Sequence, residues 1–221
     1  MNILIVGNDG NFKEARQKFG ESHSYILTET QSEAKRHFSS SQLIFDFILE
    51  KDPSQINRYI GEPSITVFIN TSKVSLKELV SLTDKPIQCV LFGFCGLSTF
   101  LNRPLLEVTL LQNKDKEKLT SVCGSLDTKF AVVEDRAGLI TPRVICMIIN
   151  EAYYTLEEGT ASREDIDLAM KLGTNYPYGP FEWAQRIGLQ QVHELLDAVY
   201  KDTKDERYKI CTLLKEESSV S

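Results

Sequence analysis

The chain has 221 residues, of which 42% are hydrophobic and 25% are charged, as expected of a globular protein that buries one large core or two small ones. Its net charge is −6, and segments such as "DKEK" and "KDTKDERYK" mix both signs, which excludes the usual basic surface of a nucleic-acid-binding protein. No apolar run approaches the roughly 20 residues of a membrane span, and "MNILIVGNDG" lacks the features of a signal peptide. We therefore expect a cytoplasmic protein without nucleic-acid or membrane partners.

The sequence contains five cysteines and three histidines in no metal-binding pattern. The odd number and the scatter of the cysteines predict reduced thiols rather than a disulfide framework. Neither residue type has the spacing of zinc ligands, so we expect no metal site. The residues are Cys89, Cys95, Cys123, Cys146, Cys211, His23, His37 and His193.

Residues 1–135 alternate short apolar segments with polar helical ones. Helices are predicted for "NFKEARQKF", "SLKELVSL" and "DKEKLTSVCG". Strands that alternate with helices and are almost continuously apolar are typical of a mostly parallel sheet covered on both faces. The predicted strands are, in chain order, "NILIV", "SYIL", "LIFDFIL", "SITVFIN", "IQCVLFGF", "LLEVTLL" and "FAVVED".

The pattern becomes purely helical after residue 135. Apolar residues four apart over 138–158 predict a long helix that is buried on much of its circumference. Ser162 is the predicted N-cap of a second helix. The segment "YPYGPF" interrupts the helical pattern, and further helices are predicted for "IGLQQVHELLDAVY" and "ERYKICTLLKEE". We therefore predict an α/β unit over 1–135 and a helical unit over 136–221.

The string "NEAYYTLEEGTASREDIDLAMKLGTNYPYGPFEW…IGL" resembles the C-terminal domain of the NAD-dependent 3-hydroxyacyl-CoA dehydrogenases, a family that includes the 3-hydroxybutyryl-CoA dehydrogenases. Weaker resemblances precede it in "LIFDFILE", "INTSKVSL", "FGFCGLSTFLNRPLLEV" and "GLITPR". The resemblance implies a reduced, Rossmann-like dinucleotide-binding domain followed by the family's helical dimerisation domain. It also implies NAD as cofactor, a role in fatty acid metabolism and a homodimer formed through the helical domain.

The family oxidises 3-hydroxyacyl-CoA with a His–Glu pair, assisted by a Ser and an Asn. The resemblance assigns the Ser to Ser72 and the Glu to Glu107, and Cys95 stands twelve residues earlier (107 − 95 = 12) in place of the His. A thiol titrates near ~8.5, and a neighbouring carboxylate raises that pKa, so Cys95 is a poor base at neutral pH. Losing a general base typically costs about 10²–10⁴ in rate. The family's Asn aligns with Pro142, which offers no donor.

The substituted Cys95 and the retained Ser72 also have interpretations without a chemical role. Cys95 suits a small buried hydrophobic residue, and the "NTS" that ends at Ser72 is an ordinary sequence for a turn at the end of a strand.

A dinucleotide loop reads GxGxxG, and here only its first glycine, Gly7, is in register. Asp9 and Phe12 replace the second and third glycines, adding a negative charge near the phosphates and bulk between helix and strand, and Gly10 is out of register. Glu29 stands where a ribose-binding acid belongs (29 − 7 = 22), although acidic residues at strand ends are common. The candidate cofactor residues are Gly7, Gly10 and Glu29, and the altered loop predicts a decayed NAD site.

Three hypotheses follow from these observations. In the first, the chain is a working dehydrogenase. In the second, it is a catalytically silent relative that acts as a dimeric interaction protein or binds acyl-CoA or another small ligand. In the third, it uses a cleft lined by Ser72, Cys95 and Glu107 for a different ligand. The second hypothesis is favoured because this chain replaces the family's catalytic base, its substrate-binding Asn and two of its loop glycines. It is also favoured by the short segment "TQSEAKRHFSSSQ", where the family has a helical hairpin that helps to hold CoA. We therefore predict a 3-hydroxyacyl-CoA dehydrogenase-like protein with impaired or lost catalysis.

Overall fold

A computed structural model describes residues 1–220 of the chain. They form two compact units, the first ending at Leu139 and the second beginning at Ile140. The first unit combines a sheet with helices and the second is helical, which confirms the predicted fold class.

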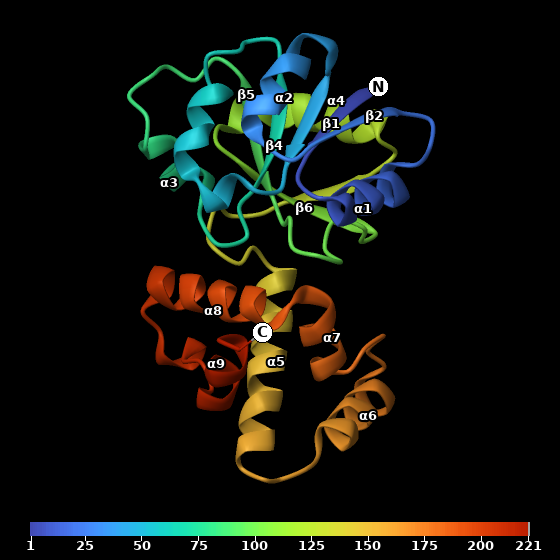
Figure 1. Ribbon diagram of the computed structural model, residues 1–221, viewed down its shortest axis with the longest axis vertical. Helices are drawn as coiled ribbons and strands as arrows, with labels where there is room; N and C mark the ends of the chain where they lie inside the picture. The colour runs from blue at the N-terminus through green and yellow to red at the C-terminus, as the bar shows by residue number, and fades with distance from the viewer. Residues whose placement is uncertain (221) are drawn as a thin grey trace. The chain divides into compact units, whose positions relative to one another are not determined.

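The first unit is built on a sheet that, within the described residues, has seven strands in the order β2-β1-β3-β4-β5-β6-β7 (Figure 1). Neighbouring strands are parallel except for β5 and β6, which are antiparallel. Each apolar segment singled out in the sequence overlaps one of these strands, because their Val, Ile, Leu and Phe side chains suit a sheet covered on both faces. The strands are β1 Asn2–Val6, β2 Ser24–Thr28, β3 Leu43–Asp46, β4 Thr66–Asn70, β5 Val90–Phe94, β6 Leu105–Leu110 and β7 Lys129–Val132.

Helices cover both faces of this sheet. One apolar cluster joins one face to α1 and α4, and a second cluster joins the other face to the short helices between β2 and β5. The helices are α1 Asp9–Phe19, α2 Gln31–Ala34, α3 Leu76–Ser81 and α4 Lys116–Ser125, with 3-10 turns at Lys35–Ser40, Leu49–Lys51, Pro53–Arg58 and Asn113–Asp115.

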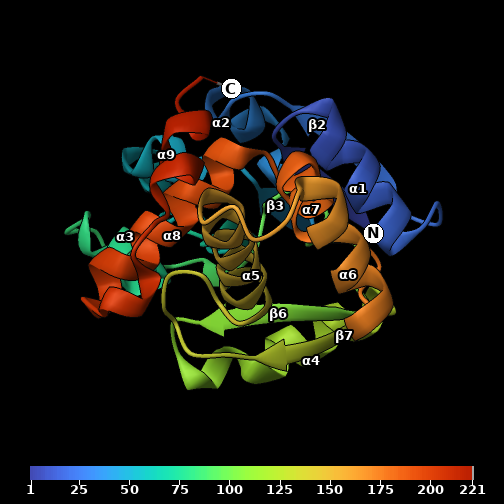
Figure 2. The ribbon, with the colours of Figure 1, turned by 90° about the horizontal axis from the view of Figure 1, so that it is seen from below.

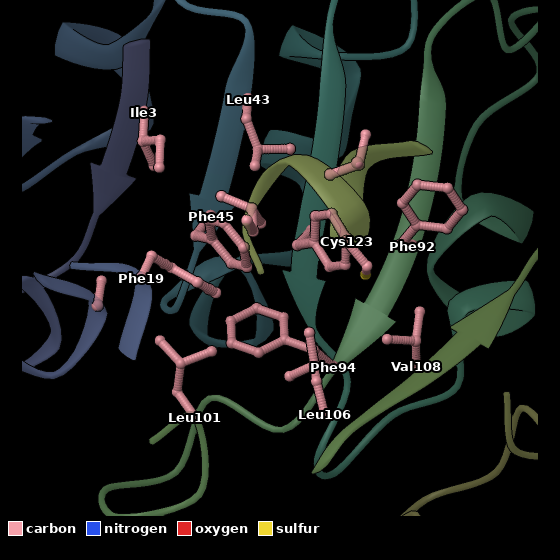
Figure 3. Close-up of a cluster of buried hydrophobic side chains, with 14 of the residues drawn as sticks. Ile3, Phe19, Leu43, Phe45, Phe92, Phe94, Leu101, Leu106, Val108 and Cys123 are labelled. Atoms are coloured by element: carbon pink, nitrogen blue, oxygen red, sulfur yellow. The ribbon is translucent and has the colours of Figure 1, made fainter. Parts of the chain in front are cut away.

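Aromatic rings from neighbouring strands fill the centre of the first cluster (Figure 3). The ring of Phe45 stacks on that of Phe68 with 4.7 Å between centroids, and it meets the edge of Phe94 at 5.5 Å. Phe19 from α1 approaches the same ring at 5.1 Å. These contacts fix the strands that carry the candidate site.

Strand β3 ends earlier than the segment "LIFDFIL" predicted, because the carboxylate of Asp46 turns the chain. Asp46 is fully buried, and it accepts a hydrogen bond from the backbone N–H of Ile48 at 2.8 Å. It also accepts from the hydroxyl of Tyr59 at 2.7 Å and from Nε2 of Gln31 at 3.1 Å. Burial raises the pKa of Asp46, and these hydrogen bonds oppose that shift.

The second unit is arranged around α5, which contacts α7, α8 and α9 (Figure 2). The predicted long helix is therefore present, beginning at Thr141 and ending at Glu157. Ser162 is the N-cap of the next helix, as predicted, and accepts a hydrogen bond from the N–H of Asp165. The helices are α5 Thr141–Glu157, α6 Arg163–Thr174, α7 Pro180–Ile187, α8 Leu189–Thr203 and α9 Thr212–Ser218, with a 3-10 turn at Glu206–Tyr208.

Helix α7 begins inside "YPYGPF", which the sequence pattern marked only as an interruption. Pro180 occupies the first turn, where its missing N–H costs nothing. The N–H groups of Phe181 and Glu182 donate to the carboxylate of Asp167 on α6, at 2.8 and 3.2 Å. The start of α7 is therefore set partly by another helix, in addition to Glu182, whose Oε2 accepts from the N–H of Gly179 at 3.1 Å. Gly179 is also required, because a Cβ there would lie 2.3 Å from Cγ of Asp167.

The segment "ERYKICTLLKEE" is not one helix as predicted, but a 3-10 turn followed by α9. The interruption arises at Asn150 on α5. Its side-chain N–H donates to the carbonyl of Lys209 at 2.9 Å, and its Oδ1 accepts from the N–H of Cys211 at 2.9 Å. These backbone groups bond to α5 instead of continuing a helix.

Candidate functional site

The sheet reverses its strand order at β1, which lies between β2 and β3. In open α/β sheets, ligands bind outside the carboxyl ends of the strands at such a reversal. The ends of β1 and β3 are joined here by a hydrogen bond from the N–H of Phe47 to the carbonyl of Val6, at 2.9 Å. Gly7 follows at once, and its N–H donates to the carbonyl of Thr28 at the end of β2. Gly7 therefore lies at the strand end where a dinucleotide fold places its phosphate loop.

The loop after β1 is closed by two asparagines. Asn8 is the N-cap of α1: its Oδ1 accepts from the N–H of Asn11 at 3.0 Å, and its own N–H donates to Oδ1 of Asn11 at 3.0 Å. A Cβ on Gly7 would lie 2.6 Å from Oδ1 of Asn11, so the Asn11 side chain packs against Gly7. A dinucleotide loop offers the N–H groups at a helix N-terminus to phosphate. Here two of the N–H groups at this turn bond to the protein's own side chains.

The other residues of this loop differ in burial. Asp9 is exposed and pairs with Lys13 at 2.5 Å, and Gly10 lies in the first turn of α1. Phe12 is half-buried against the core and meets the ring of Tyr25 edge-on, with 6.2 Å between centroids. It does not push α1 away from the sheet, since α1 still contacts β1 and β2.

Glu29, the candidate ribose-binding acid, follows β2 and is exposed. The residue before it, Thr28, is buried, and its hydroxyl has no hydrogen-bond partner within the described residues. The carboxyl end of β2 therefore carries one exposed carboxylate and one buried hydroxyl.

The three predicted catalytic residues share one edge of the sheet. Ser72 follows the end of β4, and Cys95 directly follows the parallel strand β5. Strand β6 is antiparallel to β5 with Phe94 opposite Val108, so the same register places Glu107 opposite Cys95. Ser72 is fully buried and Cys95 almost so. The structure therefore brings Cys95 and Glu107 together, with Ser72 on the neighbouring strand end.

Two charged residues that the sequence analysis missed lie at the same edge. Burial lowers the pKa of Arg103, and the nearby carboxylates of Glu107 and Glu14 oppose that shift. Glu14 on α1 accepts hydrogen bonds from the N–H groups of Thr99 and Asn102, at 3.3 and 3.1 Å. Burial raises the pKa of Glu14, and these backbone bonds oppose the shift. Helix α1 thus fixes the β5–β6 loop that carries Arg103.

An ion pair lies beside Ser72. The hydroxyl of Ser72 donates to Oε2 of Glu50 at 3.2 Å, and Nζ of Lys73 lies 3.1 Å from Oε1 of the same carboxylate. The side chains of Glu50 and Lys73 are only 10% and 16% exposed. Both could have been noticed in the sequence, since Glu50 ends "LIFDFILE" and Lys73 follows Ser72.

The edge therefore contains a hydroxyl, a thiol, carboxylates, an ammonium and a guanidinium, without an imidazole beside Glu107. Such groups can hydrogen-bond a polar ligand, but an imidazole, the usual proton acceptor near neutral pH, is not among the groups described at this edge. Pro142, the residue aligned with the family's Asn, lies in the first turn of α5 in the second unit. Within residues 1–220 there is no cluster of three or more potential metal ligands and no helix with the length and hydropathy needed to cross a membrane.

The helical unit has an apolar groove of about 490 Å³ between α5 and α6. Exposed leucines, Leu168 and Leu172, lie on the same helix as part of this groove, and Val144 is exposed on α5. The lining residues are Ile148, Glu151, Ala152, Thr155, Ala161, Asp165, Ile166, Ala169, Met170 and Pro180.

Sequence comparison finds similarity to 3-hydroxybutyryl-CoA and 3-hydroxyadipyl-CoA dehydrogenases. The family model "3-hydroxyacyl-CoA dehydrogenase, C-terminal domain" matches residues 138–218. A 3-hydroxybutyryl-CoA dehydrogenase of Bradyrhizobium diazoefficiens is 33% identical over 159 residues, which cover 69% of this chain and 53% of that protein. A 3-hydroxyadipyl-CoA dehydrogenase of Escherichia coli is 44% identical over 84 residues, 38% of this chain and 18% of that protein. The chain thus spans about half the length of the first relative and less of the second.

Structural comparison gives the same fold. The crystal structure of (S)-3-hydroxybutyryl-CoA dehydrogenase from Ralstonia eutropha matches with a TM-score of 0.75 and 20% identity, covering 99% of this chain and 93% of that one. At this identity the likeness establishes the fold alone.

Proposed function

We propose, from the premise that the chain belongs to the 3-hydroxyacyl-CoA dehydrogenase family, that it is a non-catalytic member of that family. In this proposal the first unit keeps the family's fold but does not hold NAD, and the second unit forms a homodimer. The family reaction, NAD-dependent oxidation of 3-hydroxyacyl-CoA in fatty acid metabolism, is then impaired or lost.

The observation that carries the proposal is the reciprocal pair of hydrogen bonds between Asn8 and Asn11. Pyrophosphate binds to a Rossmann loop through backbone N–H groups and needs close approach to the glycines. The Asn11 side chain occupies the space over Gly7, and Asp9 adds a negative charge to the same turn. A phosphate would have to displace a bonded amide and face a carboxylate.

The residues at the catalytic positions support the same proposal. Hydride transfer from a 3-hydroxyacyl substrate needs a base for the hydroxyl proton, and a thiol opposite a carboxylate is a weak one at neutral pH. Arg103 helps to balance the charge of Glu107, but it supplies no proton acceptor because a guanidinium stays protonated. The arrangement suits binding better than proton transfer.

We expect the protein to bind no NADH at millimolar cofactor concentration and to reduce no NAD with 3-hydroxybutyryl-CoA. Titration calorimetry and NADH fluorescence measure the first, and NADH absorbance measures the second. A 3-hydroxybutyryl-CoA dehydrogenase assayed in parallel is the positive control. Saturable binding with a micromolar Kd, or steady NADH formation, would refute the proposal.

The cluster of Ser72, Glu50 and Lys73 favours a second candidate, a protein that binds acyl-CoA or another small polar ligand. Its groups are largely buried and are held by a hydrogen bond and an ion pair, as in a preformed site. Thermal-shift measurements with NADH, acetoacetyl-CoA and free CoA separate the two candidates, since a ligand that binds only the folded state raises the melting temperature. A shift with CoA but not with NADH would identify an acyl-CoA binder, and no shift with any of the three would favour a dimeric interaction protein.

We expect a homodimer through the helical unit, because its apolar groove and the exposed Leu168 and Leu172 form a surface that a second copy can cover. Replacing the exposed Ala169 in that groove by glutamate should give a monomer by sedimentation at micromolar concentration. The matched control is Leu82→Glu, which alters an exposed apolar residue of the first unit and should leave the dimer intact. A monomeric parent protein would contradict the expectation.

A further inference from the structure

Asn70, the last residue of β4, connects three strand ends at the candidate site. It is only 2% exposed. Its Nδ2 donates to the carbonyl of Phe47 after β3, at 3.2 Å. Its Oδ1 accepts from the N–H of Ser72 at 3.2 Å and from the N–H of Gly96 at 2.8 Å. One side chain therefore contacts the backbone beside both Ser72 and Cys95.

The orientation of this amide is fixed by its partners. Two backbone N–H groups face one end and a carbonyl faces the other, so only one placement of oxygen and nitrogen satisfies all three. Phe47 is in turn bonded to Val6 at the end of β1. The amide thus completes a continuous set of hydrogen bonds along the carboxyl ends of β1, β3, β4 and β5.

Gly96 allows this contact. A Cβ on Gly96 would lie 2.7 Å from Cγ of Asn70 and 2.9 Å from its Cβ, closer than real Cβ atoms approach other atoms. The backbone after Cys95 therefore packs directly on the Asn70 side chain. Gly93, three residues earlier in β5, is crowded by different side chains, those of Thr109 and Thr71.

We infer that Asn70 is a positioning residue, which holds Ser72 and the Cys95–Gly96 turn in fixed relation to the end of β3. The inference rests on the proposed function only for the identity of the site. It implies that the geometry of the edge is maintained by a buried polar group, even though the base and the phosphate loop have changed. A ligand at this edge would meet a rigid backbone.

The five unbridged cysteines allow a direct test by site-resolved alkylation, with rates measured for each cysteine by mass spectrometry. Buried thiols react through local opening of the structure. Loss of the Asn70 hydrogen bonds destabilises the closed state around Cys95, so Asn70→Ala should raise the alkylation rate at Cys95 about fivefold or more relative to the rate at Cys89. Cys89 lies in the same unit and is similarly buried. A merely structural loss would raise both rates in proportion.

Asn150 provides the matched control. It is a buried amide that also joins one carbonyl and one N–H of a distant segment, in the helical unit. Asn150→Ala should raise the alkylation rate at its neighbour Cys211 relative to the rate at Cys89. It should leave the ratio of the Cys95 rate to the Cys89 rate within about twofold of the value in the parent protein.

Gly96→Ala tests the same contact from the other side, and also serves if Asn70→Ala yields no soluble protein. It should raise the Cys95 rate selectively. In the double variant with Asn70→Ala its effect should be smaller than in the parent, because alanine removes the Cγ and Nδ2 atoms that the added Cβ would meet at 2.7 and 3.1 Å and leaves only the Cβ contact at 2.9 Å. Gly93→Ala should show no such reduction. Equal acceleration at all cysteines, no change at Cys95 in either variant, or simple additivity of Asn70→Ala and Gly96→Ala would overturn the inference. None of these readouts depends on NADH binding or turnover, so the proposed function can fail separately.

Discussion

Replacing Asp46 by alanine should lower the free energy of unfolding by about 3 kcal/mol or more, since each buried polar group left without a partner costs about 1–3 kcal/mol. The substitution leaves the Tyr59 hydroxyl, the Gln31 amide and the Ile48 N–H without their acceptor. These groups come from three separate segments, so the whole edge around β3 should loosen. Denaturation in urea, followed by circular dichroism, measures the change.

Asp46→Asn is the control, because asparagine keeps the shape and can still accept from Ile48. It should cost much less than Asp46→Ala. Equal losses in the two variants would show that the hydrogen bonds to the carboxylate contribute little.

The parent protein and Asp46→Asn also test how the contribution of Asp46 to stability depends on pH. Burial raises the pKa of Asp46 above its ordinary value of 3.8, so the folded state holds this proton more tightly than the unfolded state. The stabilisation is therefore complete below pH 3.8 and is lost as pH rises through the folded-state pKa. The stability of the parent relative to Asp46→Asn should fall over that range, and a difference that grows with pH would contradict it.

Cys95→His should not restore the family reaction, although a missing general base by itself accounts for about 10²–10⁴ in rate. The new imidazole would stand opposite Glu107, as the strand register requires. We expect this variant to bind no NAD, because the Asn8–Asn11 bonds and Asp9 remain. The aligned Pro142 would still offer the substrate no hydrogen bond. NADH absorbance with 3-hydroxybutyryl-CoA and millimolar NAD measures the outcome.

Cys95→Ser controls for disturbance of the buried turn, and both variants should be compared with the parent by melting temperature. Measurable NADH production by a folded Cys95→His protein would show that the base was the only missing part, and would refute the proposal that the phosphate loop is closed.

The sheet was predictable because its strands are continuous apolar segments whose signal is local. The end of β3 was not, since Asp46 turns the chain with help from Tyr59 and Gln31, which are distant in the sequence. Helix α7 was missed for the same reason, because Asp167 on another helix satisfies its first N–H groups.

The candidate site was predictable in position but not in surroundings. Matching strings of the family located Ser72, Cys95 and Glu107, and the structure brings them to one edge, although their roles stay predictions. Arg103 could not be assigned, because its neighbours are set by the β5–β6 loop. Lys73 is visible beside Ser72 in the sequence, but its pairing with Glu50 depends on the turn after β4. The Asn8–Asn11 bonds were predictable from two asparagines three residues apart after a strand, but the GxGxxG pattern carries no information about these two positions.

The contact between Gly179 and Asp167 limits what can be concluded from the resemblance of this chain to the dehydrogenases. It lies in "YPYGPFE", among the strings most like the dehydrogenases, and there the glycine gives room to a carboxylate that starts the next helix. The residues of this string thus have a folding role that does not depend on the chemistry of the first unit. Likeness at this string therefore reports on the packing of α6 against α7 in the helical unit, and it carries no information about the chemistry of the first unit.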